Sequence, residues 1–170
     1  RTSRQRLVDL NFFNKVAMKR ERGSAPDKTI ITVDIEEKST GSLNLGVGYG
    51  TDAGPLIDVT LRERNLLGLG QNLSLSTTLA AERSSINLSF TEPYFMDREV
   101  NAGFDLYHTR RDFQDTRSYD SQDTGFALRT GYPLTQKLSQ NWKYGLDISK
   151  ITNVGNNASP LIQNEKGENY

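Results

Sequence analysis

Apolar and polar residues alternate along most of the chain between Gly41 and Asn101, in segments of about ten residues separated by short turns. In the first segment the odd positions are apolar and the even positions are small or polar. The apolar residues of that segment are Leu43, Leu45, Val47 and Tyr49. Because successive side chains of a strand point to opposite faces, the pattern predicts an antiparallel all-β sheet with one apolar face and one polar face.

Seven strands are predicted from this alternation and from the turn residues between its segments. Their expected ranges are 41–50, 55–64, 71–81, 85–92, 99–110, 122–132 and 141–152. These strands are longer than the usual five or six residues of soluble sheets and suit a tilted strand that crosses a bilayer. Strand length therefore favours a transmembrane β-barrel over a soluble β-sandwich or another soluble binding module.

The connections and the aromatic residues favour the same interpretation. Connections after the even-numbered strands are expected to stay short, whereas those after the odd-numbered strands grow, up to 111–121 and 153–170. Aromatic girdles are expected at both membrane interfaces. The expected girdle residues are Tyr94, Phe95, Tyr132 and Trp142 at the short-turn end, with Tyr49 and Tyr107 at the other end.

Each face of the predicted barrel wall has its own set of residues. The residues expected to face lipid are Leu73, Leu75, Ile86, Leu88, Phe90, Phe104 and Leu106. The residues expected to line a wet lumen are Asn44, Gly46, Gly48, Asp58, Thr60, Arg62, Ser74, Ser76, Thr78, Asn87 and Ser89. Seven strands cannot close a bacterial barrel, so we expect residues 39–170 to be the first part of a barrel that further sequence completes.

Residues 1–38 have a different, strongly charged pattern. Leu7 and Leu10 predict a short helix ending near Asn11, with Thr2 and Ser3 as N-caps. Two strands follow at 12–19 and 29–37, joined by the loop 23–27. A helix and a hairpin cannot bury a core alone, so residues 1–38 are expected to be the last part of a small α+β domain. The whole chain, which opens on Arg1 without an apolar leader, is expected to be an internal fragment of a longer protein.

Composition excludes several function classes. Hydrophobic residues make up 35% of the chain, mean hydropathy is −0.63, and no apolar run is long enough for a membrane helix. Low hydropathy is also typical of membrane barrels, whose inward residues are polar. Lys plus Arg equals Asp plus Glu at 21 each, without a basic block, so no nucleic acid partner is predicted. The lack of cysteine excludes disulfides, thiol catalysis and cysteine metal sites.

The sequence contains no catalytic or metal-ligating constellation, so neither an enzyme, a cofactor nor a metal is predicted. His108 is the only histidine and is interpreted as a girdle or loop residue. The glycines of 46–50 lie inside a strand, not between a strand and a helix, which argues against a phosphate-binding loop. The acidic residues between 112 and 123 lack the spacing of a calcium loop and are interpreted as a solvated loop.

Three phrases in order resemble the BamA family of outer-membrane protein assembly factors, in which POTRA domains precede a transmembrane barrel. They are TGSLNLGVGYG at 40–50, NLLGLG at 65–70 and FTEPYF at 90–95. Residues 4–16 and 33–37 resemble the end of the last POTRA domain. The resemblance covers nearly the whole chain, is strongest in residues 1–107 and weakens in the long loops.

The resemblance implies a sixteen-stranded outer-membrane barrel with residues 1–38 in the periplasm. Its partners would be unfolded outer-membrane proteins, periplasmic lipoproteins of the assembly complex and outer-membrane lipid. It also implies that the first barrel strand pairs weakly with the last, opens toward the bilayer and templates a substrate strand. The strand-pairing residues would be Gly41, Ser42, Leu43, Asn44, Leu45, Gly46, Val47, Gly48 and Tyr49.

Two alternatives stay open on the sequence. The first is a related POTRA-barrel pore for protein secretion or autotransporter assembly. The second concerns the glycines at 46, 48 and 50. Each lowers strand stability by roughly 0.5–1 kcal/mol relative to alanine, which would weaken the seam, but glycine also fits a crowded or kinked barrel position.

Overall fold

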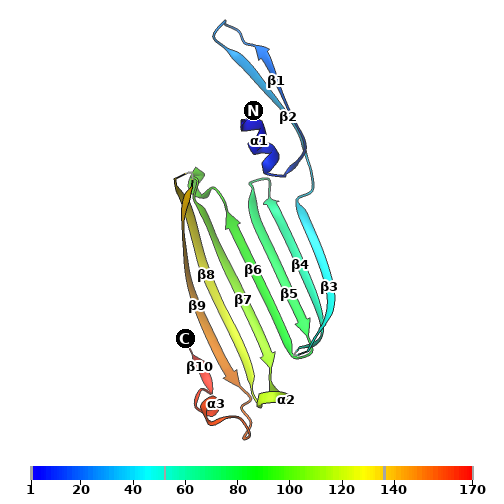
Figure 1. Ribbon diagram of the computed structural model, residues 1–170, viewed down its shortest axis with the longest axis vertical. Helices are drawn as coiled ribbons and strands as arrows, with labels where there is room; N and C mark the ends of the chain where they lie inside the picture. The colour runs from blue at the N-terminus through cyan, green and yellow to red at the C-terminus, as the bar shows by residue number, and fades with distance from the viewer. Residues whose placement is uncertain (1, 52, 136, 170) are drawn as a thin grey trace. The chain divides into compact units, whose positions relative to one another are not determined.

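The computed structural model describes residues 2–51, 53–135 and 137–169 and divides the chain into two compact units, Arg1–Thr40 and Gly41–Tyr170 (Figure 1). The first unit contains helix α1 (Thr2–Asp9) and the antiparallel hairpin of β1 (Phe13–Arg22) and β2 (Thr29–Glu37). Its buried apolar residue is Val16, which pairs with Ile35, and Thr40 is buried as well, whereas the apolar side chains of β2, Ile35 included, are exposed. The predicted helix and hairpin are both present, but Thr2 and Ser3 lie inside α1 and are not its N-caps.

The second unit is one curved antiparallel sheet, in which sequential strands are neighbours (Figure 1). Its long strands are β3 (Gly41–Gly50), β4 (Gly54–Leu66), β5 (Gln71–Ala80), β6 (Arg83–Glu92), β7 (Asn101–Asp112), β8 (Asp120–Thr135) and β9 (Leu138–Thr152). Short elements occupy the connections: η1 (Phe95–Asp97), α2 (Gln114–Arg117), α3 (Pro160–Asn164) and β10 (Gly167–Asn169), which pairs with β9.

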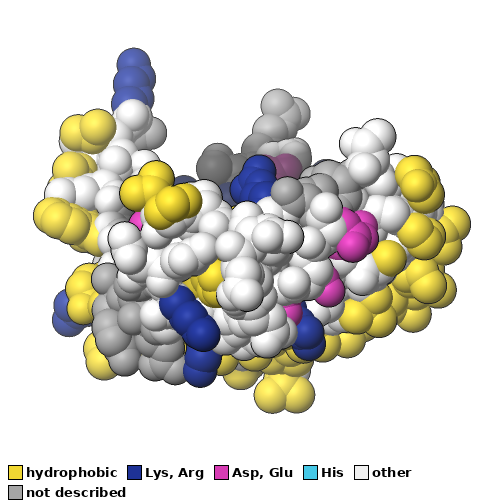
Figure 2. Space-filling model, turned by 90° about the horizontal axis from the view of Figure 1, so that it is seen from below, with side chains coloured by type: hydrophobic (Ala, Val, Ile, Leu, Met, Phe, Trp, Pro, Cys, Tyr) yellow, Lys and Arg dark blue, Asp and Glu magenta, His cyan; other side chains and the backbone are white. Residues whose placement is uncertain are grey.

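The strand register separates the two faces of this sheet. Directly paired residues share a face, and one continuous row across seven strands is Leu43, Leu61, Leu75, Leu88, Leu106, Phe126 and Leu146. The row of the opposite face one position along is Asn44, Thr60, Ser76, Asn87, Tyr107, Gly125 and Asp147. We call these the apolar face and the polar face. In the end-on view of Figure 2, hydrophobic side chains gather along the right-hand and lower rim.

The observed strands match the predicted ones in number and order, and they are longer at several ends. β8 and β9 contain 16 and 15 residues, so they extend beyond the apolar rows. The predicted contrast in connection length is smaller than expected, because residues 93–100 form as long a connection as residues 113–119 at the opposite end of the sheet. The transmembrane-barrel interpretation is therefore supported by the length of the strands and not by the length of the connections.

One predicted girdle residue lies elsewhere. Tyr107 pairs with Asn87 and Gly125 on the polar face, so it cannot belong to an aromatic girdle on the apolar face. Tyr49 and Trp142 do lie on the apolar face and are 78% and 60% exposed. Within the described residues, no helix is long and apolar enough to cross a membrane.

Candidate functional site

The predicted strand-pairing residues all lie on β3, the last strand on one side of the described sheet. β4 is its hydrogen-bonded neighbour, in a register that runs from Gly41 opposite Glu63 to Gly50 opposite Gly54. The apolar side chains of β3 have a neighbouring strand on one side only and are largely exposed: Leu45, Val47 and Tyr49 are 72%, 85% and 78% exposed. A strand with one paired side presents free N–H and C=O groups along its other side, which is the geometry for adding a further strand.

Backbone pairing is the main attachment of β3 to the sheet. In the part of the chain that the structure describes, neither Ser42 nor Asn44 makes a side-chain hydrogen bond, and no ion pair involves β3. We call the contact between two neighbouring strands a seam. Across the seam between β4 and β5, by contrast, Thr78 Oγ1 on β5 donates a hydrogen bond of 2.6 Å to Asp58 Oδ1 on β4. On the polar face, a side-chain hydrogen bond therefore joins β4 to β5, whereas Ser42 and Asn44 of β3 contribute none.

Two glycines of β3, Gly46 and Gly48, are not required by crowding within the described sheet, whereas a Cβ at Gly41 would lie 2.9 Å from Glu63 Oε2. A Cβ added at Gly46 would lie 3.6 Å from Asp58 Cβ, and one added at Gly48 would lie 3.4 Å from Leu56 Cδ1, both ordinary contacts. The situation at Gly125 on β8 is different, because a Cβ there would lie 2.5 Å from Tyr107 Oη and 2.7 Å from the Leu146 carbonyl oxygen. Packing therefore explains Gly125 in β8, and loss of strand stability is the remaining consequence of Gly46 and Gly48 in β3.

An arginine clamp joins the middle strands across the polar face. Arg129 Nε on β8 lies 2.8 Å from Asp105 Oδ2 on β7, and Arg129 Nη2 reaches β6, where it donates to Ser89 Oγ at 3.0 Å and to Thr91 Oγ1 at 3.1 Å. Ser89 Oγ in turn donates to Asp105 Oδ1 at 2.7 Å. Gly103 makes this reach feasible, because a Cβ there would lie 3.2 Å from Arg129 Nη2 and 2.5 Å from the Phe90 carbonyl oxygen.

A second polar cluster holds the opposite end of the same strands. Arg111 Nη1 on β7 lies 2.7 Å from Asp123 Oδ2 on β8, and Ser149 Oγ on β9 donates to Asp123 Oδ1 at 2.6 Å. The acids expected in a solvated loop are thus partly structural. No group of described residues has the composition of a metal site.

Asp120 lies beyond the apolar rows, beside the loop that contains α2, and is only 3% exposed. Burial raises the pKa of its carboxyl, but hydrogen bonds from Gln114 and Asn153 and the charge of Arg110 lower it, and the net pKa is below its usual range. The ionised carboxylate therefore fastens the α2 loop to the start of β8 and to the segment after β9.

His108 belongs to the apolar face near the end of its rows. Its ring nitrogen Nδ1 lies 2.6 Å from Thr124 Oγ1, and its paired neighbours are Ile86 and Thr124. This position is at the edge of the apolar band, next to the row that contains Arg110 and Gln122. The geometry agrees with a girdle residue.

The residues predicted to face lipid all lie on the apolar face. Six of them form two adjacent rows with their cross-strand partners, and Ile86 lies in the next row, paired with Thr77 and His108. Phe90 and Phe104 stack there with ring centroids 5.6 Å apart. Sequence analysis missed the members of these rows on β4 and β8, which are Leu61, Phe126 and Leu128. Alternation from Leu61 and from Phe126 was the signal that would have found them.

Comparison with known proteins agrees with this architecture. The family model of the Omp85 superfamily domain matches residues 65–169, more than half of the chain. The chain belongs to the Omp85 superfamily. Its sheet of seven long antiparallel strands is the corresponding part of that family's barrel fold.

Several relatives within this superfamily are similar over most of the chain. The outer membrane protein assembly factor BamA of Nitratidesulfovibrio vulgaris is 30% identical over 99% of this chain and 21% of the relative. BamA of Neisseria meningitidis is 28% identical over 93% of this chain and 20% of the relative. The chain thus spans about a fifth of the length of these curated relatives.

A solved structure of a relative has a similar fold over most of this chain. The crystal structure of BamA from Haemophilus ducreyi lacking POTRA domains 1–3 superimposes with a TM-score of 0.75 at 29% identity. The superposition covers 90% of this chain and 30% of that one.

Proposed function

We propose that this chain belongs to a protein that assembles and inserts β-barrel proteins into the bacterial outer membrane. β3 is the strand that templates the incoming substrate, and its strand-pairing residues are Gly41–Tyr49. Support comes from the superfamily match, from relatives named outer membrane protein assembly factors and from the geometry of β3. The observation that carries the proposal is the continuous backbone pairing of β3 with β4, in a strand whose own polar side chains, Ser42 and Asn44, make no hydrogen bond among the described residues.

A strand that templates a substrate must pair readily with another strand and must also release it. In a bilayer, an unpaired N–H or C=O group finds no water, so the free side of β3 would pair strongly with any available strand. Release then requires that the remaining interactions of β3 be weak. Two features of β3 favour release: packing does not require glycine at 46 and 48, and Ser42 and Asn44 make no side-chain hydrogen bond in the described sheet.

The proposal places the other parts of the chain accordingly. Residues 1–38 are the end of the last POTRA domain, in the periplasm, and residues 39–170 are the first strands of the barrel. The apolar face contacts outer-membrane lipid. The partners are unfolded outer-membrane proteins and the periplasmic lipoproteins of an assembly complex. The protein works without a cofactor, and no step of catalysis is assigned to it.

Site-specific disulfide crosslinking tests the role of β3. The 170 residues contain no cysteine, so single cysteines at Asn44 and Gly46 report on β3 once any cysteine elsewhere in the full-length parent is replaced by serine. A cysteine at Asp147 on β9, on the same polar face but far along the sheet, is the matched control. Each variant is combined with a stalled barrel substrate that carries single cysteines along its last strand.

We expect the β3 cysteines to crosslink to the last strand of the substrate, in a register that shifts by two residues between Asn44 and Gly46. The Asp147 control should give no substrate crosslink. Crosslinking of β3 to the parent's own last strand alone would contradict a templating role. That result would favour the related secretion pore, in which the barrel stays closed.

A further inference from the structure

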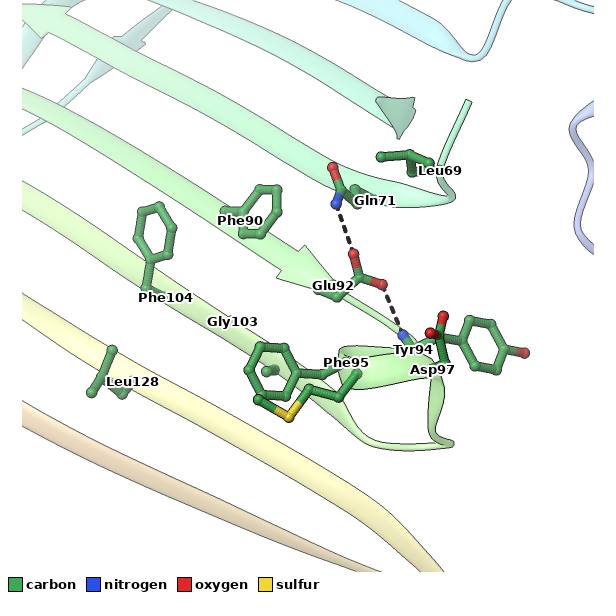
Figure 3. Close-up of a pocket in the computed structure, with 12 residues that line it drawn as sticks. Leu69, Gln71, Phe90, Glu92, Tyr94, Phe95, Asp97, Gly103, Phe104 and Leu128 are labelled. Carbon is green, nitrogen blue, oxygen red and sulfur yellow. Dashed lines mark hydrogen bonds between the residues drawn. The ribbon is translucent and has the colours of Figure 1, made fainter. Parts of the chain in front are cut away.

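A hollow of about 620 Å³ opens on the apolar face where β6 passes into β7. Phe90, Phe104 and Leu128, from three adjacent strands, line its inner part, and Phe95 from the turn 93–100 lies beside them (Figure 3). The two rings on the sheet stack with centroids 5.6 Å apart. This part of the hollow therefore offers an apolar surface made by rigid strands.

The turn end of the hollow is acidic. Glu92 is fixed there, because Gln71 Nε2 donates to its Oε2 at 2.7 Å and the Tyr94 N–H donates to its Oε1 at 2.9 Å (Figure 3). Asp97 lies at the same end (Figure 3). Among the described residues that line the hollow there are two carboxylates and no lysine or arginine. The hollow is thus amphipathic along the strand direction and negatively charged at one end.

The turn that shapes this site is held in an uncommon conformation. Met96 and Asp97 have φ angles of 56° and 57°, in the left-handed region that costs energy for residues other than glycine. Four backbone hydrogen bonds secure it: Phe95 N to Val100 O at 2.8 Å, Asp97 N to Tyr94 O at 3.0 Å, Arg98 N to Phe95 O at 3.3 Å and Val100 N to Arg98 O at 2.7 Å. Such strain persists where the surrounding structure fixes it, often at binding sites.

We propose that this hollow binds a phospholipid with a primary ammonium headgroup, of the phosphatidylethanolamine type. One acyl chain lies over Phe90, Phe104 and Leu128, and the ammonium group lies beside Glu92 and Asp97. The proposal rests on the membrane location given under the proposed function. The order of polarity along the hollow, from an apolar surface at the strands to carboxylates at the turn, matches that of a lipid whose headgroup lies at the interface.

Headgroup chemistry decides among the membrane lipids. A primary ammonium donates hydrogen bonds to carboxylates, whereas the quaternary ammonium of a choline lipid has no N–H to donate. An anionic glycerol lipid would be repelled by Glu92 and Asp97, since no basic side chain lines the hollow within the described residues. The site is therefore expected to prefer the ethanolamine headgroup at equal acyl chains.

Photolabelling of the full-length parent in liposomes tests this preference. Ethanolamine and choline lipids that carry the same diazirine acyl chain are compared, and adducts are located by peptide mass spectrometry. Leu146 and Ile148 on the apolar face of β9 do not line the hollow and report on ordinary boundary lipid. The test variants are Glu92→Gln and Asp97→Asn, and the matched control is Glu99→Gln, an exposed acid of the same turn that does not line the hollow.

We expect peptides that contain Phe104 or Leu128 to label roughly two- to five-fold more with the ethanolamine lipid, the range for solvent-screened ion pairs. Glu92→Gln and Asp97→Asn should reduce this ratio, and Glu99→Gln should not. Asparagine tolerates the left-handed conformation of residue 97, so the second variant keeps the turn.

Three results would overturn the proposal. Equal labelling of the hollow by both lipids would mean boundary lipid without headgroup selection. Labelling on β9 but not in the hollow would mean that protein covers it. Absence of labelling at both sites would contradict the membrane location itself, and with it the proposed function.

Discussion

β3 and β8 lie in the same sheet and have similar alternation, but they are held in different ways. β8 is fixed on both sides by charged side chains, through Arg129 to β7 and β6 and through Asp123 to β7 and β9. β3 is attached to β4 by its backbone, and its apolar side chains are largely exposed. The two strands therefore differ in the side-chain links of the polar face, and from this difference we expect them to differ in how easily they separate from their neighbours.

The two strands also use glycine differently. In β8, Gly125 leaves room for the Tyr107 ring across the seam, so the glycine increases cross-strand packing. In β3, a Cβ at position 46 or 48 would make only ordinary contacts, so glycine at these positions lowers strand stability without improving the packing. Glycine therefore improves packing between β7 and β8 but lowers the stability of β3 beside β4.

The largest expected effect comes from proline in the loosely held strand. Gly46→Pro removes a backbone donor of β3, which blocks one ladder hydrogen bond with β4 or with a strand added on the other side. We expect loss of growth and of barrel assembly in a strain depleted of the parent protein. Leu56→Ala on β4, opposite Gly48, trims a side chain but keeps the ladder and should support growth. Equal growth of the two variants would contradict a special role for β3.

A charge on the apolar face should have the next largest effect. Leu88 lies in the middle strand of the row from Leu43 to Leu146, so Leu88→Arg should lower the free energy of unfolding by about 2–4 kcal/mol. The measurement is denaturant unfolding of the full-length barrel in liposomes. Asn87→Arg, the neighbouring position on the polar face, should change stability far less. Similar losses for both variants would show that the two faces are assigned wrongly.

Alanine at the two kinds of glycine compares the seams directly. Gly125→Ala should destabilise the barrel by about 1–3 kcal/mol, because the new methyl group overlaps the Tyr107 hydroxyl and a backbone oxygen. Gly46→Ala meets no such obstacle and should stabilise β3 by roughly 0.5–1 kcal/mol. Unfolding midpoints in the same liposome assay give both values. Destabilisation by Gly46→Ala would indicate that β3 is crowded by a neighbour in the complete barrel.

The sheet could be predicted from the sequence because its strands carry strict alternation with turn residues between them. Each of the seven strands begins and ends within a few residues of its predicted range. The face of Tyr107 could not be predicted from its distance to a strand end, since alternation places it with Asn87 and Gly125. Likewise, the length of the connection 93–100 depends on the η1 turn. Its left-handed residues, Met96 and Asp97, are not glycines, so the sequence does not indicate the turn.

The candidate site was only partly accessible from sequence. The apolar and small residues of β3 were visible as a pattern, but the firmness of other seams depends on partners distant in the chain. Arg129 is 40 residues from Ser89, and nothing local marks the two as neighbours. Which seams have side-chain links could therefore be recognised only from the strand register of the structure.

A last prediction, with a smaller destabilisation than those above, tests whether the arginine clamp accounts for the contrast between β3 and β8. Arg129→Leu leaves Asp105 without its cation and breaks the links to Ser89 and Thr91 on β6. Both charged side chains are partly exposed, at 33% and 26%, so solvent reduces the loss to about 1–2 kcal/mol in free energy of unfolding. The measurement is the same unfolding assay in liposomes.

The matched variant is Arg62→Leu, also on the polar face but on β4 beside β3. Arg62 is exposed and, among the described residues, forms no ion pair, so its loss should change stability by less than about 0.5 kcal/mol. If the Arg62 variant lost as much stability as the Arg129 variant, the seam between β3 and β4 would have an electrostatic clamp of its own. β3 would then be as firmly held as β8, and a strand that templates substrates would have to be sought at another seam.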